Sequence, residues 1–146
     1  MGTLEKIKER FGNKIKKIFM HNEKRAYIEI DKNHLLDFTE FIFSLPGVRF
    51  VTASGVDNLD NMEIIYHFSF DPEDLMVSIK TFIDRNNPEI ESISNIIKGA
   101  QNIEREMYEL LGIKFKNHPK LTRFLIDELP EGVYPLRKNA ERQVEQ

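Results

Sequence analysis

The sequence predicts an α+β fold: a two-layer α/β sandwich with a mainly antiparallel sheet in the order ββαβββ, followed by a short helix and an extended C-terminal arm. Three observations support this prediction. Several short segments alternate apolar and polar residues, as half-buried strands do. Residues 34–45 instead carry apolar residues at helical spacing. The later strand segments are joined by short polar turns, and strands joined in this way pair antiparallel.

The composition is typical of a globular protein. The chain has 146 residues, of which 40% are hydrophobic and 31% charged, so it can bury a core. A net charge of −3 gives no reason to expect nucleic acid as a partner. The chain has no cysteine, which excludes a thiolate zinc site and an iron–sulfur cluster held by this chain alone. It shows no apolar run of membrane-spanning length and no secretion signal, so we expect a cytoplasmic protein.

The N-terminal elements are a helix and a hairpin. Residues 3–11 carry a narrow apolar stripe, and Gly12 is placed to end that helix. Residues 14–21 and 25–31 are rich in strand formers and flank a polar connection. This end is also basic, which fits either a solvated face or a segment that docks on an acidic partner. The basic residues are Lys6, Lys8, Arg10, Lys14, Lys16 and Lys17.

The core helix at residues 34–45 and three strands follow. Asn33 is placed to cap the helix, and Pro46-Gly47 ends it. Its apolar face consists of Leu35, Phe38, Phe41, Ile42 and Leu45. Strands are predicted at 48–54, 61–70 and 75–83. In the second, every other residue from Met62 to Phe70 is apolar, so we expect the helix to cover this face of the sheet.

We divide the chain into a sandwich domain at residues 1–86, a helix and arm at 87–138, and a flexible tail at 139–146. After the helix predicted at 103–111 the chain contains three further prolines, Pro119, Pro130 and Pro135, and no recognisable strand. Such a segment cannot build a core of its own. We therefore expect it to wrap the domain or to lie on another protein.

The helix at 103–111 is densely charged. Its apolar face holds Ile103, Met107, Leu110 and Leu111, and Gly112 is placed to close it. Glu104 and Glu106 flank that face roughly 160° apart, so they cannot share a metal ion or a proton. Arg105 and Glu109 are four residues apart on the far side of the helix from the apolar face, and we expect them to form an exposed ion pair.

Glu106, Glu109 and His118 are the candidate metal ligands, and a small metal-binding enzyme is one alternative function. Carboxylate-bridged metal sites need further inward ligands such as a Glu-x-x-His pair, which this chain lacks. His118 precedes Pro119, and we expect it to cap or hydrogen-bond at that corner. The sequence shows no glycine-rich phosphate loop and no nucleophile motif, so it predicts no catalytic residue.

The segment 104–125, followed by "YPLRK" at 134–138, resembles the 30 kDa subunit family of respiratory complex I, the NADH dehydrogenase of respiratory chains. That family also includes the corresponding small subunit of energy-converting, membrane-bound nickel–iron (NiFe) hydrogenases. The matching positions follow the family's order and irregular spacing. They are Glu104, Arg105, Glu106, Glu109, Gly112, Ile113, Phe115, His118, Pro119, Leu121, Arg123, Tyr134, Pro135, Leu136, Arg137 and Lys138. Two departures are Glu109, where Asp is commoner, and Asn102-Ile103, which replace an aromatic residue.

The resemblance implies a cofactor-free structural subunit of a membrane-associated oxidoreductase, with no activity of its own. Its partners would be the hydrogenase-like large (49 kDa-type) subunit and a neighbouring iron–sulfur subunit. Those partners would carry nickel–iron or quinone sites and iron–sulfur clusters. The chain would lie on the cytoplasmic side and meet the membrane only through the complex. The signature residues would form the partner interface, with Arg105 and Arg137 as ion-pair anchors. An adaptor with a basic N-terminal docking segment is the remaining alternative.

Overall fold

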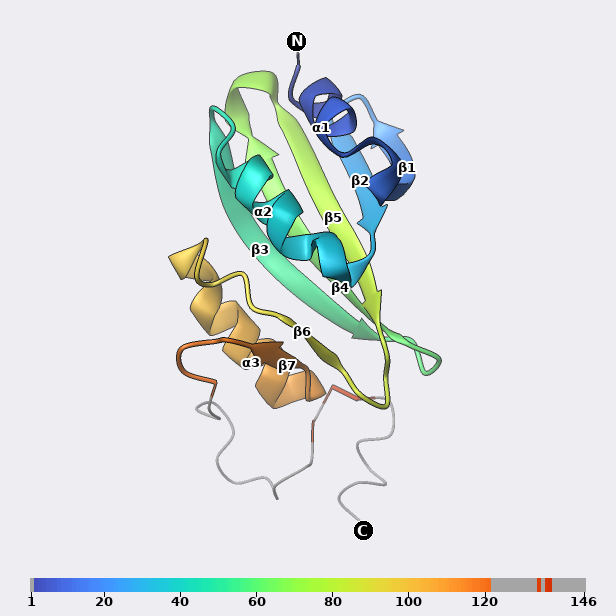
Figure 1. Cartoon of the computed structure of the whole chain (residues 1–146), viewed down its shortest axis with the longest axis vertical. Helices are drawn as coiled ribbons and strands as arrows, with labels where there is room; N and C mark the ends of the chain where they lie inside the picture. The colour runs from blue at the N-terminus through green and yellow to red at the C-terminus, as the bar shows by residue number, and fades with distance from the viewer. Residues whose placement is uncertain (1, 122–133, 135, 138–146) are drawn as a thin grey trace. The chain divides into compact units, whose positions relative to one another are not determined.

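The computed structural model describes residues 2–121 together with residues 134, 136 and 137 (Figure 1). The chain forms two compact units. The first comprises Met1–Ala53 and Ile65–Thr81, and the second comprises Ser54–Ile64 and Phe82–Gln146. The second unit therefore combines a hairpin end from the middle of the chain with the C-terminal part.

The predicted ββαβββ order is confirmed, with a helix before it. The elements are α1 (Thr3–Phe11), β1 (Ile15–Asn22), β2 (Arg25–Ile30), α2 (Leu35–Phe43), β3 (Val48–Asp57), β4 (Met62–Phe70) and β5 (Leu75–Ile83). They form a five-stranded sheet in the order β1-β2-β5-β4-β3.

The sheet is mostly antiparallel, as predicted, but β2 and β5 run parallel. The parallel pair follows from the path of the chain. After α2 the chain enters the sheet at β3, the edge opposite β1, and returns through two short connections until β5 lies beside β2. A parallel pair needs such a long crossover, and α2 forms part of it.

The predicted core faces are confirmed. All the alternating apolar residues of β4 from Met62 to Phe70 are fully buried. Leu35, Phe38 and Ile42 of α2 are also buried, and Figure 1 shows α1 and α2 on the same face of the sheet. Phe11 of α1 stacks on Phe38 with ring centroids 3.7 Å apart. Helical and strand periodicity therefore identify this core correctly.

The predicted cap of the core helix is wrong by two residues. A 3-10 turn at Lys32–His34 precedes α2, and the side chain of Asp31 accepts a hydrogen bond from the Asn33 backbone N–H at 2.9 Å. The turn moves the first unsatisfied N–H upstream, so Asp31 takes the capping role expected of Asn33.

The second unit contains a small β–α–β arrangement. Its elements are β6 (Glu89–Glu91), a 3-10 turn (Lys98–Ala100), α3 (Gln101–Leu111) and β7 (Lys114–Lys116). β6 and β7 pair in parallel, and α3 lies in the connection between them. The prediction of no strand after the helix is wrong. β7 is missed because three residues are too few to show a period.

This unit has a core of its own, to which residues after α3 contribute. The buried apolar residues after β5 are Ile90, Ile93, Ile97, Ala100, Met107, Leu111, Ile113 and Phe115. The β3 backbone at Gly55 approaches α3 so closely that a Cβ there would lie 2.7 Å from Leu111 Cδ1. The part of the arm at residues 113–121 is thus packed within the unit, although its sequence suggests that it lacks a core.

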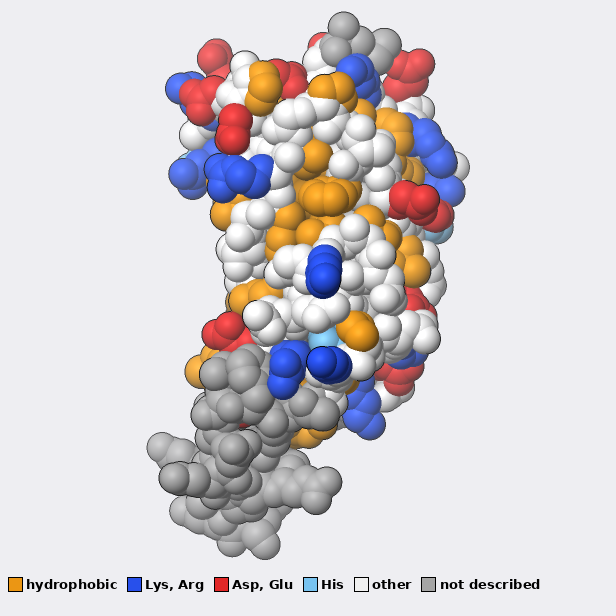
Figure 2. Space-filling model, turned by 90° about the vertical axis from the view of Figure 1, so that its left-hand side faces the viewer, with side chains coloured by type: hydrophobic (Ala, Val, Ile, Leu, Met, Phe, Trp, Pro, Cys, Tyr) orange, Lys and Arg blue, Asp and Glu red, His pale blue; other side chains and the backbone are white. Residues whose placement is uncertain are grey.

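Some large apolar side chains remain exposed on the first unit. They are Phe19 and Met20 on β1, Leu36 and Phe43 on α2, and Val51 on β3. Figure 2 shows hydrophobic side chains gathered in the middle of one face, with charged side chains around them. Among the described residues, no helix combines the length and apolar character needed to cross a lipid bilayer.

Candidate functional site

Helix α3 is the centre of the candidate site, and two of its glutamates are buried. Met107 and Leu111 face the core as predicted. Glu104 and Glu109 are also fully buried, so the exposed position predicted for Glu109 is wrong. Burying a carboxylate is costly unless hydrogen-bond donors surround it. The charged helix is therefore not simply a solvated face.

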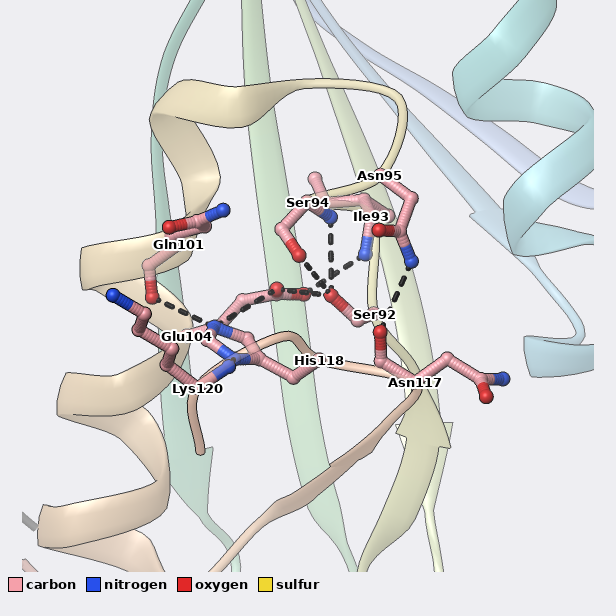
Figure 3. Close-up of polar contacts among 9 residues, drawn as sticks. All are labelled: Ser92, Ile93, Ser94, Asn95, Gln101, Glu104, Asn117, His118 and Lys120. Carbon is pink, nitrogen blue, oxygen red and sulfur yellow. Dashed lines mark hydrogen bonds and ion pairs between the residues drawn. The ribbon is translucent and has the colours of Figure 1, made fainter. Parts of the chain in front are cut away.

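Glu104 joins α3 to the loop that follows β6 (Figure 3). The Ser92 hydroxyl donates to Glu104 Oε1 at 2.6 Å, and the Ile93 backbone N–H donates to Oε2 at 3.0 Å. The Ser94 backbone N–H donates in turn to Ser92 Oγ at 3.1 Å. Both carboxylate oxygens thus accept from residues 92 and 93, which holds the loop against the helix.

Two opposing effects set the pKa of Glu104. Burial disfavours the ionised form, while the hydrogen bonds from Ser92 and Ile93 favour it, and together they raise the pKa to about 7. Burial is the larger effect. Near neutral pH this carboxyl group therefore exists in both protonation states.

His118 connects the segment that follows β7 to the first residue of α3. Its Nδ1 accepts from the Lys120 backbone N–H at 2.9 Å, and its Nε2 lies 3.0 Å from the Gln101 carbonyl oxygen. Because an amide N–H can only donate, the ring proton lies on Nε2, which donates to Gln101. Figure 3 shows the imidazole between these groups and Glu104. The corner hydrogen bonding predicted for His118 is therefore present.

The alternative metal site is not assembled. Both ring nitrogens of His118 are already engaged by backbone groups. Across residues 2–121, 134, 136 and 137, no three His, Cys, Asp or Glu side chains lie close enough to hold a metal ion. Glu106, Glu109 and His118 therefore do not form the ligand set considered from the sequence.

The C-terminal end of α3 is closed by residues from far along the chain. Gly112 adopts the left-handed conformation, with φ of 79°, as predicted. The Leu136 backbone N–H donates to the Leu110 carbonyl at 2.8 Å, and Arg137 Nε donates to the Leu111 carbonyl at 2.8 Å. Helix ends leave such carbonyls without partners. The second part of the signature therefore caps the helix that contains the first part.

Gly112 also makes room for Tyr134. A Cβ at position 112 would lie 2.8 Å from two carbon atoms of the Tyr134 ring, closer than real Cβ contacts. The ring packs over the helix end, and the Arg137 guanidinium lies 5.9 Å from its centroid. Glycine is thus required here for its φ angle and for the close approach of an aromatic side chain.

Asp57 and Arg85 form a buried ion pair that the sequence analysis missed. Arg85 Nε donates to Asp57 Oδ1 at 2.7 Å, and Arg85 Nη2 donates to Oδ2 at 3.0 Å. The Asp57 side chain is 1% exposed and that of Arg85 16%. Such paired geometry is strong when water is excluded. Asp57 ends β3 and Arg85 follows β5, so the two residues are far apart in the sequence and no local motif marks them.

The remaining signature residues differ in accessibility. Arg105 and Glu106 are half-buried on α3, Pro119 is exposed, and Leu136 is 57% exposed. The ion pair between Arg105 and Glu109 stays a prediction. Arg123, Pro135 and Lys138 lie outside the described residues.

Comparison with known proteins identifies similar chains. Residues 28–146 match the family described as "Respiratory-chain NADH dehydrogenase, 30 Kd subunit". The chain is 32% identical to a subunit of the F(420)H(2) dehydrogenase of Methanosarcina mazei over 141 residues, which cover 94% of this chain and 89% of the relative.

Two solved structures share the fold. A chain of the membrane-bound sulfane sulfur reductase, an archaeal respiratory membrane complex, superposes with a TM-score of 0.81 at 20% identity, covering 93% of this chain and 82% of that one. A trypsin-resistant fragment of Nqo5 superposes with a TM-score of 0.71 at 18% identity, covering 81% of this chain and 98% of the fragment. At these identities the likeness concerns the fold alone.

Proposed function

The chain belongs to the respiratory-chain NADH dehydrogenase 30 kDa subunit family, and on this basis we propose that it is a structural subunit of a membrane-bound respiratory oxidoreductase. Two proteins described above support this role. One is a subunit of F(420)H(2) dehydrogenase, and the other comes from an archaeal respiratory membrane complex. The subunit would lie on the cytoplasmic side and attach to the membrane through the complex.

One observation carries the structural role: the signature residues bind one another. Glu104 and His118 fasten the segments on either side of α3, and Tyr134 and Arg137 pack against its C-terminal end. The carboxylate of Glu104, the imidazole of His118 and the Nε of Arg137 are used in hydrogen bonds within the unit. Such an arrangement forms a rigid platform, which suits a subunit whose task is to hold another protein in place.

The partner we propose is the hydrogenase-type large (49 kDa-type) subunit, with an iron–sulfur subunit nearby. Leu136 supports this choice of surface, because it is a large apolar residue left 57% exposed beside Arg137 and Tyr134. Arginine and tyrosine are enriched at the centres of protein interfaces. The redox groups, whether nickel–iron or quinone sites and iron–sulfur clusters, would belong to the partners, and this chain would hold no cofactor.

Co-purification tests this proposal. The tagged full-length chain, co-expressed with the large subunit encoded beside it, should retain that subunit through affinity and size-exclusion steps. Trypsin should cleave after Arg123 more slowly in the complex than in the isolated chain. Elution of the large subunit separately from the intact chain would contradict the proposal.

A pair of leucine variants locates the contact surface. Leu136→Glu should weaken retention of the large subunit, because it would bury a charge against the partner. Leu36→Glu is the matched control, since Leu36 is also an exposed leucine but lies on α2 of the first unit. Equal retention of the large subunit by both variants would show that Leu136 is not part of the interface.

A further inference from the structure

Arg137 is held in a defined orientation. Its Nε donates to the Leu111 carbonyl at 2.8 Å, and its backbone N–H donates to the Tyr134 carbonyl at 3.1 Å. The Tyr134 ring lies beside the guanidinium. The side chain is half-buried, so one part of it contacts protein and another part reaches solvent. These contacts fix the position of the two terminal nitrogens.

Arg137 lies within electrostatic range of a second arginine. Arg85 is paired with Asp57 through two hydrogen bonds, and both residues influence the charge of Arg137. Burial and the neighbouring Arg85 lower the pKa of Arg137, whereas Asp57 raises it. A half-buried cation beside another cation is stabilised when an anion approaches it.

The terminal nitrogens of Arg137 are available for such an anion. No described residue accepts a hydrogen bond from them. An arginine fork matches a carboxylate in shape, since two N–H groups can donate to its two oxygens. The neighbouring side chain of Leu136 is apolar and exposed, so a protein docked there would exclude water from the ion pair.

We propose that Arg137, positioned by the Leu111 carbonyl and by the Tyr134 ring, receives a carboxylate from an Asp or Glu side chain of the partner subunit. This inference rests on the proposed function, because it names one anchor of that interface. The ion pair would be covered on one side by Leu136.

Binding kinetics with the full-length chain and the large subunit test this inference. In Arg137→Gln the dissociation rate constant should rise at least about 30-fold while the association rate constant changes little, as expected for a buried charged pair. Arg137→Lys keeps the charge but not the fork, and should recover part of the loss. Arg49→Gln is the matched control, since Arg49 pairs with Asp71 on the surface of the first unit, and its dissociation rate should not change.

Hydrogen exchange in the isolated chain separates an anchor from a merely structural residue. Arg137→Gln and Arg137→Lys both lose the Nε bond to the Leu111 carbonyl, so the Leu136 N–H, bonded to the Leu110 carbonyl, should exchange at the same rate in the two variants. Equal dissociation rates for the two variants would overturn the inference, because the charge at position 137 would then make no difference to binding. Unchanged dissociation of Arg137→Gln would also overturn the inference. This holds even if the variant destabilises the isolated chain, because that result would indicate that the carboxylate comes from the same chain. Failure of the wild-type chain to bind would instead refute the proposed function.

Discussion

Glu104 Oε1 and His118 Nε2 lie 3.9 Å apart, and neither side chain is exposed to solvent. Glu104 holds the loop before α3 through Ser92 and Ile93, and His118 holds the segment after β7 through Gln101 and Lys120. Hydrogen bonds thus connect the N-terminal half of α3 to the loop before the helix and to the segment after β7. Two titratable residues of the signature therefore maintain the architecture of the second unit.

Stability should depend on pH through Glu104. Burial raises the pKa of Glu104 from 4.5 to about 7 in the folded chain. Between these values the folded state binds a proton that the unfolded state does not, so the free energy of unfolding falls as pH rises. The fall amounts to up to about 3 kcal/mol and ends above pH 7. Urea denaturation of the wild type at several pH values measures it.

Glu104→Gln is the matched variant for this measurement, because an amide does not titrate. The difference in unfolding free energy between wild type and variant should change across pH 4.5 to 7 and become constant above it. A difference that is constant from pH 4.5 to 8 would contradict the shifted pKa.

His118→Ala should destabilise the chain by about 2 kcal/mol, because it removes hydrogen bonds to two backbone groups, one of them part-buried, and takes away a fully buried side chain. These groups are the Gln101 carbonyl and the Lys120 N–H. His21→Ala is the control, since His21 is exposed on β1 and its loss should change stability little. Thermal unfolding followed by circular dichroism compares them, and equal melting temperatures would show that the imidazole of His118 is dispensable.

Gly112→Ala should cost about 2 kcal/mol or more. Alanine is strained at a φ of 79°, and its Cβ would displace the Tyr134 ring. The amide of Leu136 should then exchange faster, because Tyr134 and Leu136 close the same helix end. Gly99→Ala provides the comparison: no atom lies within 4 Å of a Cβ at that position, so its stability should match the wild type.

Asp57→Asn should destabilise the chain by about 3 kcal/mol, since it leaves the guanidinium of Arg85 poorly compensated in a water-poor position. Asp71→Asn tests the same pair of residue types at the surface, where Arg49 and Asp71 are both mostly exposed. Its effect should be much smaller, because solvent screens an exposed pair. Similar losses in urea denaturation would show that burial does not control the strength of these pairs.

The sequence by itself determined the elements and the core of the first unit. The alternation in β4 and the helical face of α2 identified the residues that the structure buries. The left-handed glycine after α3 was also predictable from its position. These features depend on residues a few positions apart. The helical and strand periods therefore appear as repeats of apolar residues in the sequence.

The tertiary structure alone decided the environment of the charged residues. The sequence places Glu104 at the margin of an apolar face, yet it is buried because Ser92 and Ile93, eleven or more positions away, supply its donors. Arg85 finds Asp57 across 28 positions, and Arg137 reaches the carbonyl of Leu111 across 26. Whether a charge is solvated or buried depends on which distant segments pack around it, and no local period carries that information.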